Sequence, residues 1–449
     1  KGVSAVATAD GAGAWAFTTV TLADGAHAFT AKATDAAGNA STASGILAVT
    51  VDTAAPAAPL ITSFANDTGA AGDGITGDNA LVLTGTAEAN STVEVFDSAT
   101  SLGSATADGM GHWSFITDPL DDGSHSFTAT ATDAAANLSA APEPLVVSVD
   151  TEAPAAPTIA GYANDTGVEA DGVTGDNILV LSGTAEENSI VEVFDGAISL
   201  GSVTANGMGG EWTFTTATLD DGAHTFTATA TDAAGNTSTA SGTLGVTVDT
   251  APPAAPVITG FVSDTGTVGD GITGDNALVL TGTAEANTTV EVFNGATSLG
   301  NTTSDGAGAW AFTTGALGDG AHSFSATATD AVGNTGATSN LLAVIVDSAA
   351  PASPNITGYT TDTGVAGDGI TSDNTLFLTG TAEANSTVQV FDGVDLLASI
   401  TADSLGDWSL TTTALTDGSH SFTATATDAA GNTGAASVPL AVIVDAAAP

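Results

Sequence analysis

Short runs in which β-branched or aromatic residues alternate with small or polar ones recur along the chain, separated by clusters of Gly, Asp and Asn. This period-two pattern is typical of strands joined by turns, and it leaves no stretch with the periodicity of an amphipathic helix. Seven short strands in about a hundred residues indicate an immunoglobulin-like β-sandwich. For residues 53–150 the pattern predicts strands near 59–65, 80–86, 91–97, 101–107, 112–117, 124–132 and 143–150.

The same alternation divides the side chains between an apolar core and the solvent. It predicts that Thr128, Thr130 and Thr132 face water. The inward set contains one Trp and much Ala, so we expect a thin core that is marginally stable in an isolated repeat. This set consists of Leu81, Leu83, Val93, Val95, Trp113, Phe115, Phe127, Ala129, Ala131, Leu145, Val147 and Val149.

A repeat of about a hundred residues organises the chain. The dipeptide Val-Asp recurs with its Asp at positions 52, 150, 249, 347 and 445, at intervals of 98, 99, 98 and 98 residues. Residues 1–52 match only the second half of a unit, because Gly2 aligns with Gly103 and Trp15 with Trp113. We therefore expect a fragment that starts inside a repeat, followed by complete repeats. The predicted domains are 1–52, 53–150, 151–249, 250–347 and 348–449, the last including the start of another linker.

Charge narrows the possible partners. The 449 residues include 51 Asp plus Glu but only 2 Lys plus Arg, which gives a formal net charge of −49. Both Lys lie within the first 32 residues, so the chain cannot neutralise phosphates, and we exclude nucleic acid and anionic membrane surfaces as partners. The longest apolar runs, such as 341–346, are far shorter than the ~20 residues of a membrane span, so no membrane insertion is expected. With so few Lys and Arg, the negative charges of this chain need a bound cation to neutralise them.

The acidic residues fall in the loops at the two ends of each predicted sandwich. In the second repeat, one end carries Asp67, Asp73, Asp78, Asp122 and Asp150, and the other carries Glu88, Asp133 and Asn137. The short linker 151–157 should bring the first kind of end against the second kind in the next repeat. Two like charges ~4 Å apart repel by about 4 kcal/mol at an effective dielectric near 20, and no Lys or Arg is available there. We therefore expect a cation at each joint.

Calcium suits this ligand set, because it takes 6–8 oxygen ligands in flexible geometry, whereas the absence of Cys makes zinc unsuitable. The motif GDGITGDN alone is weak evidence for calcium, since it lacks the pattern of an EF-hand loop. Asp67 and Asp122 could equally close turns without a metal. The predicted calcium ligands are Asp52, Asp67, Asp73, Asp78, Glu88, Asp122, Asp133, Asn137, Asp150, Asp165, Asp171, Asp176, Glu186, Asp221, Asp232, Asn236, Asp249, Asp264, Asp270, Asp275, Glu285, Asp319, Asp330, Asn334, Asp347, Asp362, Asp368, Asp373, Glu383, Asp417, Asp428, Asn432 and Asp445.

No catalytic residues are predicted. Five of the six His recur in an Asp-Gly-x-His turn, close in sequence to Asp122 and its equivalents, but no nucleophile recurs at the spacing of a triad. We interpret these histidines as structural, at positions 27, 125, 224, 322 and 420. Trp113 and its equivalents could form a sugar-stacking platform, but a single Trp per unit, followed inward by Phe115, favours the core.

The sequence resembles a known family at several recurring words: VDTxAPxAP, GDGIT-x-DN, GTAEAN, L-x-DG-x-H and TATATDAAGN. These are similar to the bacterial Ig-like repeats of giant surface adhesins exported by type I secretion. The resemblance implies an extracellular stalk of biofilm type, calcium at the junctions, and a ligand-binding tip outside this fragment. The family's linker and loop acids carry onto Asp150, Asp165, Asp171, Asp176, Asp232, Asp249 and their equivalents. The chain departs from the pattern at Ala136, which replaces Gly, at Asn206 and Asn294, which replace Asp, and at Pro142 and Pro144.

The function predicted from these features is that of a non-enzymatic spacer whose partners are the neighbouring repeats of the same chain. Because strands rise ~3.3 Å per residue, four complete repeats would form an elongated rod of about 150 to 180 Å. Two alternatives stay open. The repeats could assemble with other copies into a filament or matrix, since strands of 1–52 without their partners would expose sheet edges. Less favoured is a glycan-binding module.

Overall fold

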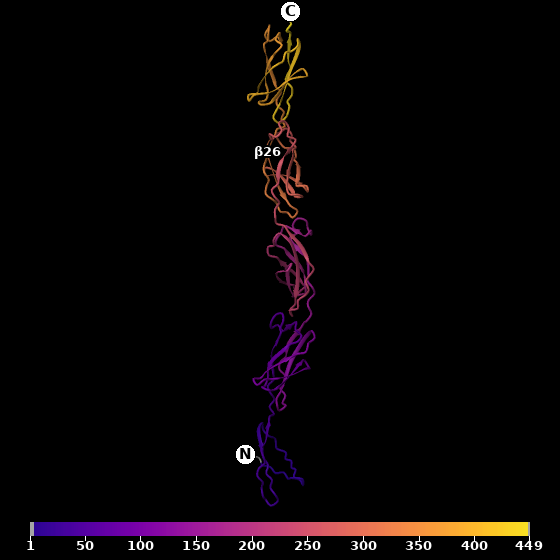
Figure 1. Cartoon of the computed structure of the whole chain (residues 1–449), viewed down its shortest axis with the longest axis vertical. Coiled ribbons are helices and arrows are strands. Elements are labelled where there is room, and N and C mark those ends of the chain that lie inside the picture. The colour runs from indigo at the N-terminus through magenta and orange to yellow at the C-terminus, as the bar shows by residue number, and fades with distance from the viewer. Residues whose placement is uncertain (1–3, 448–449) are drawn as a thin grey trace. The chain divides into compact units, whose positions relative to one another are not determined.

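The computed structural model describes residues 4–447, and all regular structure in this range is β-strand, as predicted. The alignment of Gly2 lies outside the described residues. By its internal contacts the chain divides into two compact units. Figure 1 colours the chain continuously by residue number. The first unit comprises 1–163, 178–217 and 224–245, and the second comprises 164–177, 218–223 and 246–449. The division passes through the third repeat.

The second repeat, within the first unit, contains a sandwich of two sheets. Its strands are β3 (Leu60–Ala65), β4 (Ile75–Thr76), β5 (Val82–Thr86), β6 (Thr92–Asp97), β7 (Thr100–Thr106), β8 (His112–Ile116), β9 (Gly123–Thr132) and β10 (Leu145–Val149). One sheet has the strand order β3-β5-β8, and the other has the order β4-β10-β9-β6-β7. All pairs are antiparallel except β4 with β10, which is parallel.

The first compact unit also contains the first repeat and part of the third repeat. In residues 4–52, β1 (Gly25–Phe29) pairs with β2 (Leu47–Val51). The third repeat contributes the sheet β11-β13-β16 and the antiparallel strands β15, β14 and β17. Their bounds are β11 (Thr158–Ala163), β13 (Val180–Thr184), β14 (Ile190–Asp195), β15 (Ile198–Thr204), β16 (Glu211–Thr215) and β17 (Gly222–Thr231).

In the second unit, β12 (Val173–Thr174) runs parallel to β18 (Leu244–Val248). The fourth and fifth repeats then reproduce the two sheets of the second repeat. The fourth contains β19 (Val257–Val262), β20 (Ile272–Thr273), β21 (Val279–Thr283), β22 (Thr289–Asn294), β23 (Thr297–Thr303), β24 (Ala309–Thr313), β25 (Gly320–Thr329) and β26 (Leu342–Val346). The fifth contains β27 (Asn355–Thr360), β28 (Ile370–Thr371), β29 (Phe377–Thr381), β30 (Thr387–Asp392), β31 (Asp395–Thr401), β32 (Asp407–Thr411), β33 (Gly418–Thr427) and β34 (Leu440–Val444).

All seven strands predicted for the second repeat are present, with ends that differ by at most two residues. The prediction missed β4, which the sequence pattern cannot reveal because a strand of two residues has no period. The pairing of β4 with the end of β10 places the acidic first loop, 66–79, beside Asp150 at the end of that strand.

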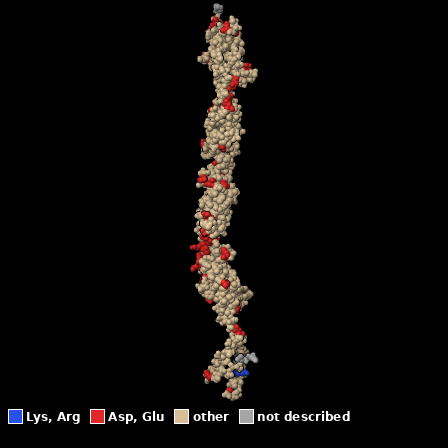
Figure 2. Space-filling view, turned by 180° about the vertical axis from the view of Figure 1, so that it is seen from behind, with Lys and Arg blue, Asp and Glu red and all other residues tan. Residues whose placement is uncertain are grey.

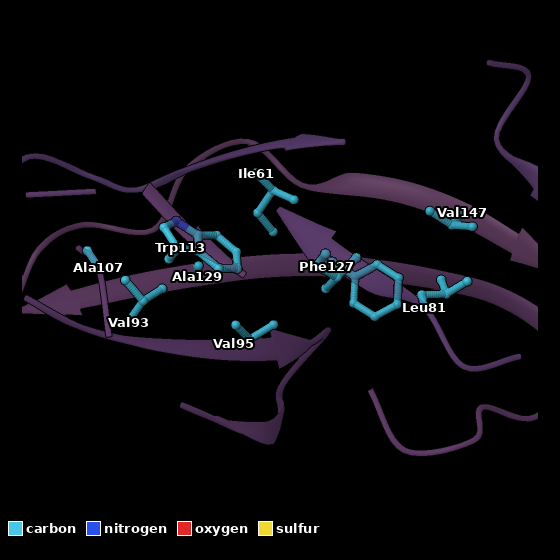
Figure 3. Packing of buried hydrophobic residues seen from close by; sticks show 10 residues of the cluster. Ile61, Leu81, Val93, Val95, Ala107, Trp113, Phe127, Ala129 and Val147 are labelled. Carbon is cyan, nitrogen blue, oxygen red and sulfur yellow. The ribbon is translucent and has the colours of Figure 1, made fainter. Parts of the chain in front are cut away.

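The core of the second repeat contains most of the predicted residues, and Figure 3 shows Trp113 packed among them. Trp113 is 4% exposed, and Gly85 lies beneath its indole, where a Cβ would overlap the Leu60 carbonyl oxygen. Two details differ from the prediction. Phe115 and Leu145 are half-buried at the margin of the core. The threonines of β9 expected to face water, at positions 128, 130 and 132, are also half-buried, because this strand lies between β10 and β6 and its neighbours cover it.

Candidate metal centre at the ends of the repeats

The last loop of each complete repeat is closed by an Asp-Asn pair that also bonds to the repeat before it. In the third repeat, Asn236 Nδ2 donates to Asp232 Oδ2 at 2.9 Å and to the backbone oxygen of Asp150 at 2.7 Å. The same amide in the other repeats bonds to the backbone oxygen that ends the preceding last strand. These bonds join Asn137 to Asp52 (3.1 Å), Asn334 to Asp249 (2.7 Å) and Asn432 to Asp347 (2.6 Å).

At the joint between the second and third repeats, Glu186 lies within electrostatic range of two other predicted ligands. Desolvation, followed by the negative charges of Asp232 and Asp150, raises the pKa of Glu186 above its ordinary value. Both Lys residues, at positions 1 and 32, belong to the first repeat, and in Figure 2 red acidic patches recur along the face shown while blue is confined to one small patch. The carboxylates therefore repel one another and would gain from a cation.

In the first loop, the predicted ligands also close their own turns. Asp67 Oδ2 accepts from the Gly72 amide at 2.5 Å, Asp73 Oδ1 from the Ile75 amide at 2.9 Å, and Asp78 Oδ1 from the Ala80 amide at 3.0 Å. This is the turn role that the sequence left open for Asp67. Equivalent bonds are made by Asp165, Asp171, Asp264, Asp270, Asp275, Asp362, Asp368 and Asp373.

One carboxylate oxygen of this loop, Asp67 Oδ1, does not help to close the turn. Asp67 Oδ1 and its counterpart Asp264 Oδ1 are buried without a hydrogen-bond donor. A buried carboxylate oxygen left without a partner is costly, and a hard oxygen of this kind is what calcium binds. In the fifth repeat, burial and then the Asp362 and Asp368 carboxylates raise the pKa of Tyr359, so both acids act on the same side chain. This donor chemistry fits a hard cation.

The remaining predicted ligands act near the linkers or stay at the surface. Asp122 Oδ1 accepts from the amide and the hydroxyl of Thr151, at 3.0 and 2.9 Å, and so fixes the start of the linker. Asp221, Asp319 and Asp417 accept equivalent bonds at the starts of the following linkers. Glu186 and its equivalents Glu88, Glu285 and Glu383 are all exposed residues. Within residues 4–447, no three His, Asp or Glu side chains form a group that could hold a metal ion.

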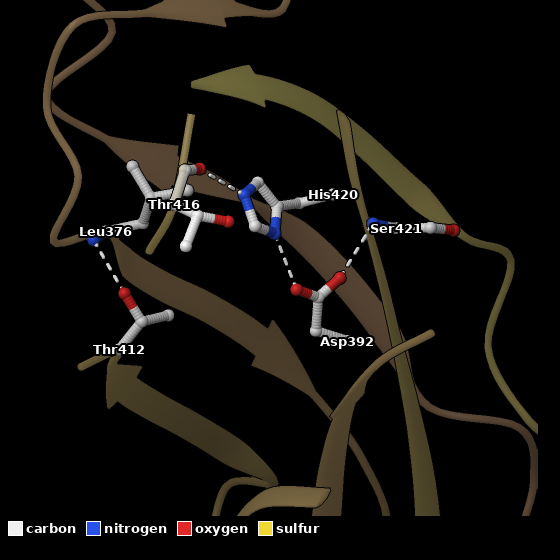
Figure 4. A network of polar contacts seen from close by, with 6 residues as sticks. All are labelled: Leu376, Asp392, Thr412, Thr416, His420 and Ser421. Atoms are coloured by element: carbon white, nitrogen blue, oxygen red, sulfur yellow. Dashed lines mark hydrogen bonds and ion pairs between the residues drawn. The ribbon is translucent and has the colours of Figure 1, made fainter. Parts of the chain in front are cut away.

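A His-Asp pair that the sequence reasoning missed recurs in three repeats. His125 Nδ1 lies 2.7 Å from Asp97 Oδ2, its Nε2 lies 2.8 Å from the Asp121 carbonyl, and its ring stacks on Phe127. Figure 4 shows the equivalent contacts of His420 with Asp392 and Thr416. The sequence placed His125 near Asp122, whereas its carboxylate partner comes from the end of β6, 28 residues earlier. A recurring Asp at the end of that strand was the available signal.

This pair predicts a pH dependence of stability. Burial alone would lower the pKa of His125, but hydrogen bonds to Asp97 and to the Asp121 carbonyl raise it above its ordinary 6.5. The stabilisation is therefore complete below about pH 6.5 and is lost as the pH rises through the raised value in the folded state. We expect the second repeat to lose up to about 1 kcal/mol between pH 6 and 8.

The measurement is hydrogen exchange of β9 across that pH range, in the wild type and in Asp97→Asn. The substitution should flatten the profile. The fourth repeat is a natural control, because Asn294 there faces His322 at 2.9 Å. An equally steep profile for β25 would contradict the assignment.

The tandem sandwiches define the class of this protein, a chain of Ig-like repeats. The model of the bacterial Ig-like domain family matches residues 1–53, 55–151, 153–250, 253–348 and 351–446. The chain belongs to this family.

Solved structures are similar at low sequence identity. One is the crystal structure of a tetra-tandem repeat in the extending region of a large adhesion protein, 23% identical, covering 88% of this chain and 100% of that chain with a TM-score of 0.36. Another comes from work on host cell surface retention of a 1.5-MDa bacterial ice-binding adhesin, 19% identical, covering 64% and 96% of the two chains with a TM-score of 0.31. No curated protein matches the sequence. Within the described residues, no helix has the length and apolarity needed to cross a membrane.

Proposed function

We propose that this chain is a non-enzymatic spacer in the stalk of a large extracellular bacterial adhesin, whose ligand-binding tip lies outside these repeats. The observation that carries the proposal is the serial joining of the repeats. In each complete repeat, the last loop bonds through its Asn to the strand end of the preceding repeat, for example Asn236 to Asp150. Such a chain gains length by adding units. Each joint transmits force from one sandwich to the next.

Calcium at the joints is the second part of the proposal. It is supported by the mutual repulsion of Asp150, Glu186 and Asp232, and by the unpartnered buried oxygen of Asp67. These residues and their equivalents would supply carboxylate oxygens to the ion, with backbone carbonyls and water completing its shell, since no three His, Asp or Glu side chains of residues 4–447 form a group that could hold it alone. Calcium would neutralise the carboxylates and oppose separation of the two repeats that supply them.

The burial of the recurring tryptophans disfavours the alternative function in which they stack on a sugar. In the four complete repeats Trp113, Trp212, Trp310 and Trp408 are between 2% and 5% exposed, so none of them offers a ring face to a sugar, whereas Trp15 in the first repeat is 58% exposed.

Calorimetric titration of calcium into the full chain, followed by small-angle scattering, tests the proposal. We expect binding at several sites and a maximum dimension of about 150 to 180 Å with calcium, from strands that rise ~3.3 Å per residue. In chelator the distribution of dimensions should become broader and more compact. A maximum dimension near that of a globule of this mass would contradict the spacer role, and the absence of a binding signal would contradict calcium.

Replacing Asp249 by Ala should weaken calcium binding at the joint between the third and fourth repeats without unfolding either. Its side chain accepts from the Ala251 amide, at 3.1 Å, while its backbone groups bond to Thr174 and Asn334. Because the backbone bonds survive the substitution, we expect affinity to fall by about tenfold, within the range through which ligand charge tunes calcium sites.

Titration calorimetry measures the affinity, and hydrogen exchange reports the fold. Glu211→Gln removes one exposed charge from the third repeat and should leave binding unchanged. Unfolding of either repeat in Asp249→Ala would show that the carboxylate supports a core.

A further inference from the structure

The first loop of one repeat contacts the last loop of the next through groups that carry no charge. At the joint between the second and third repeats, the carbonyl oxygen of Ala234 accepts from Thr68 Oγ1 at 2.5 Å and from the Gly77 amide at 3.1 Å. Ala234 is 1% exposed. The same pair of bonds recurs between the fourth and fifth repeats, where Ala430 accepts from Thr265 at 2.5 Å and from Gly274 at 3.2 Å.

Glycine permits this close approach. A Cβ at Gly69, whose φ is +76°, would overlap the carbonyl oxygen of Ala233, and a Cβ at Gly77 would lie 2.6 Å from Asn236 Oδ1. These neighbours are held in place, because Asn236 is itself bonded to Asp150 and Asp232. A side chain at either glycine would therefore separate the two loops.

The fifth repeat provides an internal comparison. Gly364 has the same left-handed conformation as Gly69, with a φ of +87°, but apart from its two chain neighbours no described residue has an atom within 4 Å of its Cβ position. Ser372 occupies the place of Gly77, and its hydroxyl lies 3.0 Å from that of Thr363 in the same loop. The glycine at position 77 is thus not needed to form the loop itself.

We propose that the first loop is a docking socket for the last loop of the following repeat, and that this docking fixes the joints between repeats 2 and 3 and between repeats 4 and 5 without a metal ion. The hydroxyl, amide and carbonyl groups involved neither need nor repel a cation. The socket accepts a partner loop only where small residues such as Gly69 and Gly77 leave room for it. Ser372, which occupies the place of Gly77, therefore makes the socket of the fifth repeat bind an Asp-Ala-Ala-Gly-Asn loop less well. This inference goes beyond the proposed function, because it holds whether or not calcium binds.

The test uses the full chain in chelator, with spin labels on either side of the joint. The protein has no Cys, so A99C and A197C, at exposed turn positions of the second and third repeats, provide unique labelling sites. Pulsed dipolar spectroscopy should give a narrow distance distribution in this background. Adding G69A should broaden it by about twofold or more, since unconstrained neighbouring domains move relative to one another. Adding G77S, which introduces the residue of the fifth repeat, should also broaden it.

G364A is the matched control, because it imposes the same backbone strain where no partner loop is present. It should leave the distribution between the labels unchanged, and hydrogen exchange should confirm that the second repeat is folded in G69A. A broad distribution in chelator that calcium narrows would overturn this inference and leave the proposed function standing. A narrow distribution that G69A leaves unchanged would also overturn it. A narrow distribution that G69A broadens, in a chain that binds no calcium, would uphold the socket and contradict the calcium proposal.

Discussion

Replacing Trp113 by Ala should unfold the second repeat while the other repeats stay folded. Trp113 is 4% exposed and packs against both sheets of its sandwich, in a cluster with Ile61, Val93 and Phe127. Loss of a buried aromatic side chain of this size costs about 3 to 5 kcal/mol. A small domain is stable by only about 5 to 15 kcal/mol in total, and a core with one Trp and several Ala belongs at the low end of that range.

Hydrogen exchange resolved by peptide measures this effect, because it separates repeats that melt at similar temperatures. Protection should fall across 60–149 and stay unchanged in the fourth and fifth repeats. Trp15, the equivalent residue in the first repeat, is 58% exposed, so Trp15→Ala should change stability by no more than about 0.5 kcal/mol. Wild-type protection of β9 in Trp113→Ala would show that the indole does not support the core.

The sandwich could be predicted from the sequence because its signals are local. Alternation along a strand fixes which side chains face inward, and so Leu81, Val93 and Val147 were assigned correctly from their immediate neighbours. The half-burial of Thr128 could not be assigned in this way, since it depends on the strands that lie on either side of β9. Local pattern determines the face of a strand but gives no information about its place in the sheet.

The candidate site was harder to predict, because Asp serves turns and metals with the same atoms. Asp73 closes its turn through one carboxylate oxygen, whereas Asp78 accepts from the Ala80 amide through Oδ1 and from Asn66 through Oδ2. Each carboxylate keeps further lone pairs, so the turn role and the ligand role do not exclude each other. The partnership of His125 with Asp97 depends on the pairing of β6 with β9, which lie far apart in the sequence.

The contact between Thr68 and Ala234 was beyond reach for a different reason. The two residues are separated by 166 positions in the sequence. Ala234, Gly69 and Gly77 also have no polar side chain from which a binding partner could be predicted. Small residues in turns are usually explained by backbone conformation, and Gly69, with its positive φ, satisfies that explanation completely. Only the position of the next repeat shows that the missing Cβ also makes room for a neighbour.

Calcium should raise the melting temperature of the chain by about 10 to 20 °C. An ion that binds the folded joints but not the dispersed acids of the unfolded chain stabilises by about 2.7 kcal/mol at a hundredfold excess over its dissociation constant. For a domain of this size each kcal/mol corresponds to about 4 to 8 °C. The physical source is the relief of repulsion among groups such as Asp150, Glu186 and Asp232, in a chain with a formal charge of −49.

Two controls separate binding at the joints from general screening of this charge. Sodium chloride at matched ionic strength screens exposed charges over a Debye length of about 10 Å at 0.1 M, and it should give only a small part of the shift. Magnesium, which demands octahedral geometry and keeps its waters, should also give less than calcium. Superimposed melting curves in calcium and in chelator would contradict the proposal that calcium binds at the joints. Equal shifts of the melting temperature in all three salts would show that the stabilisation comes from charge screening alone. In either case uncharged contacts, namely the bond from Asn236 to the Asp150 backbone oxygen and the socket around Ala234, would join the second and third repeats.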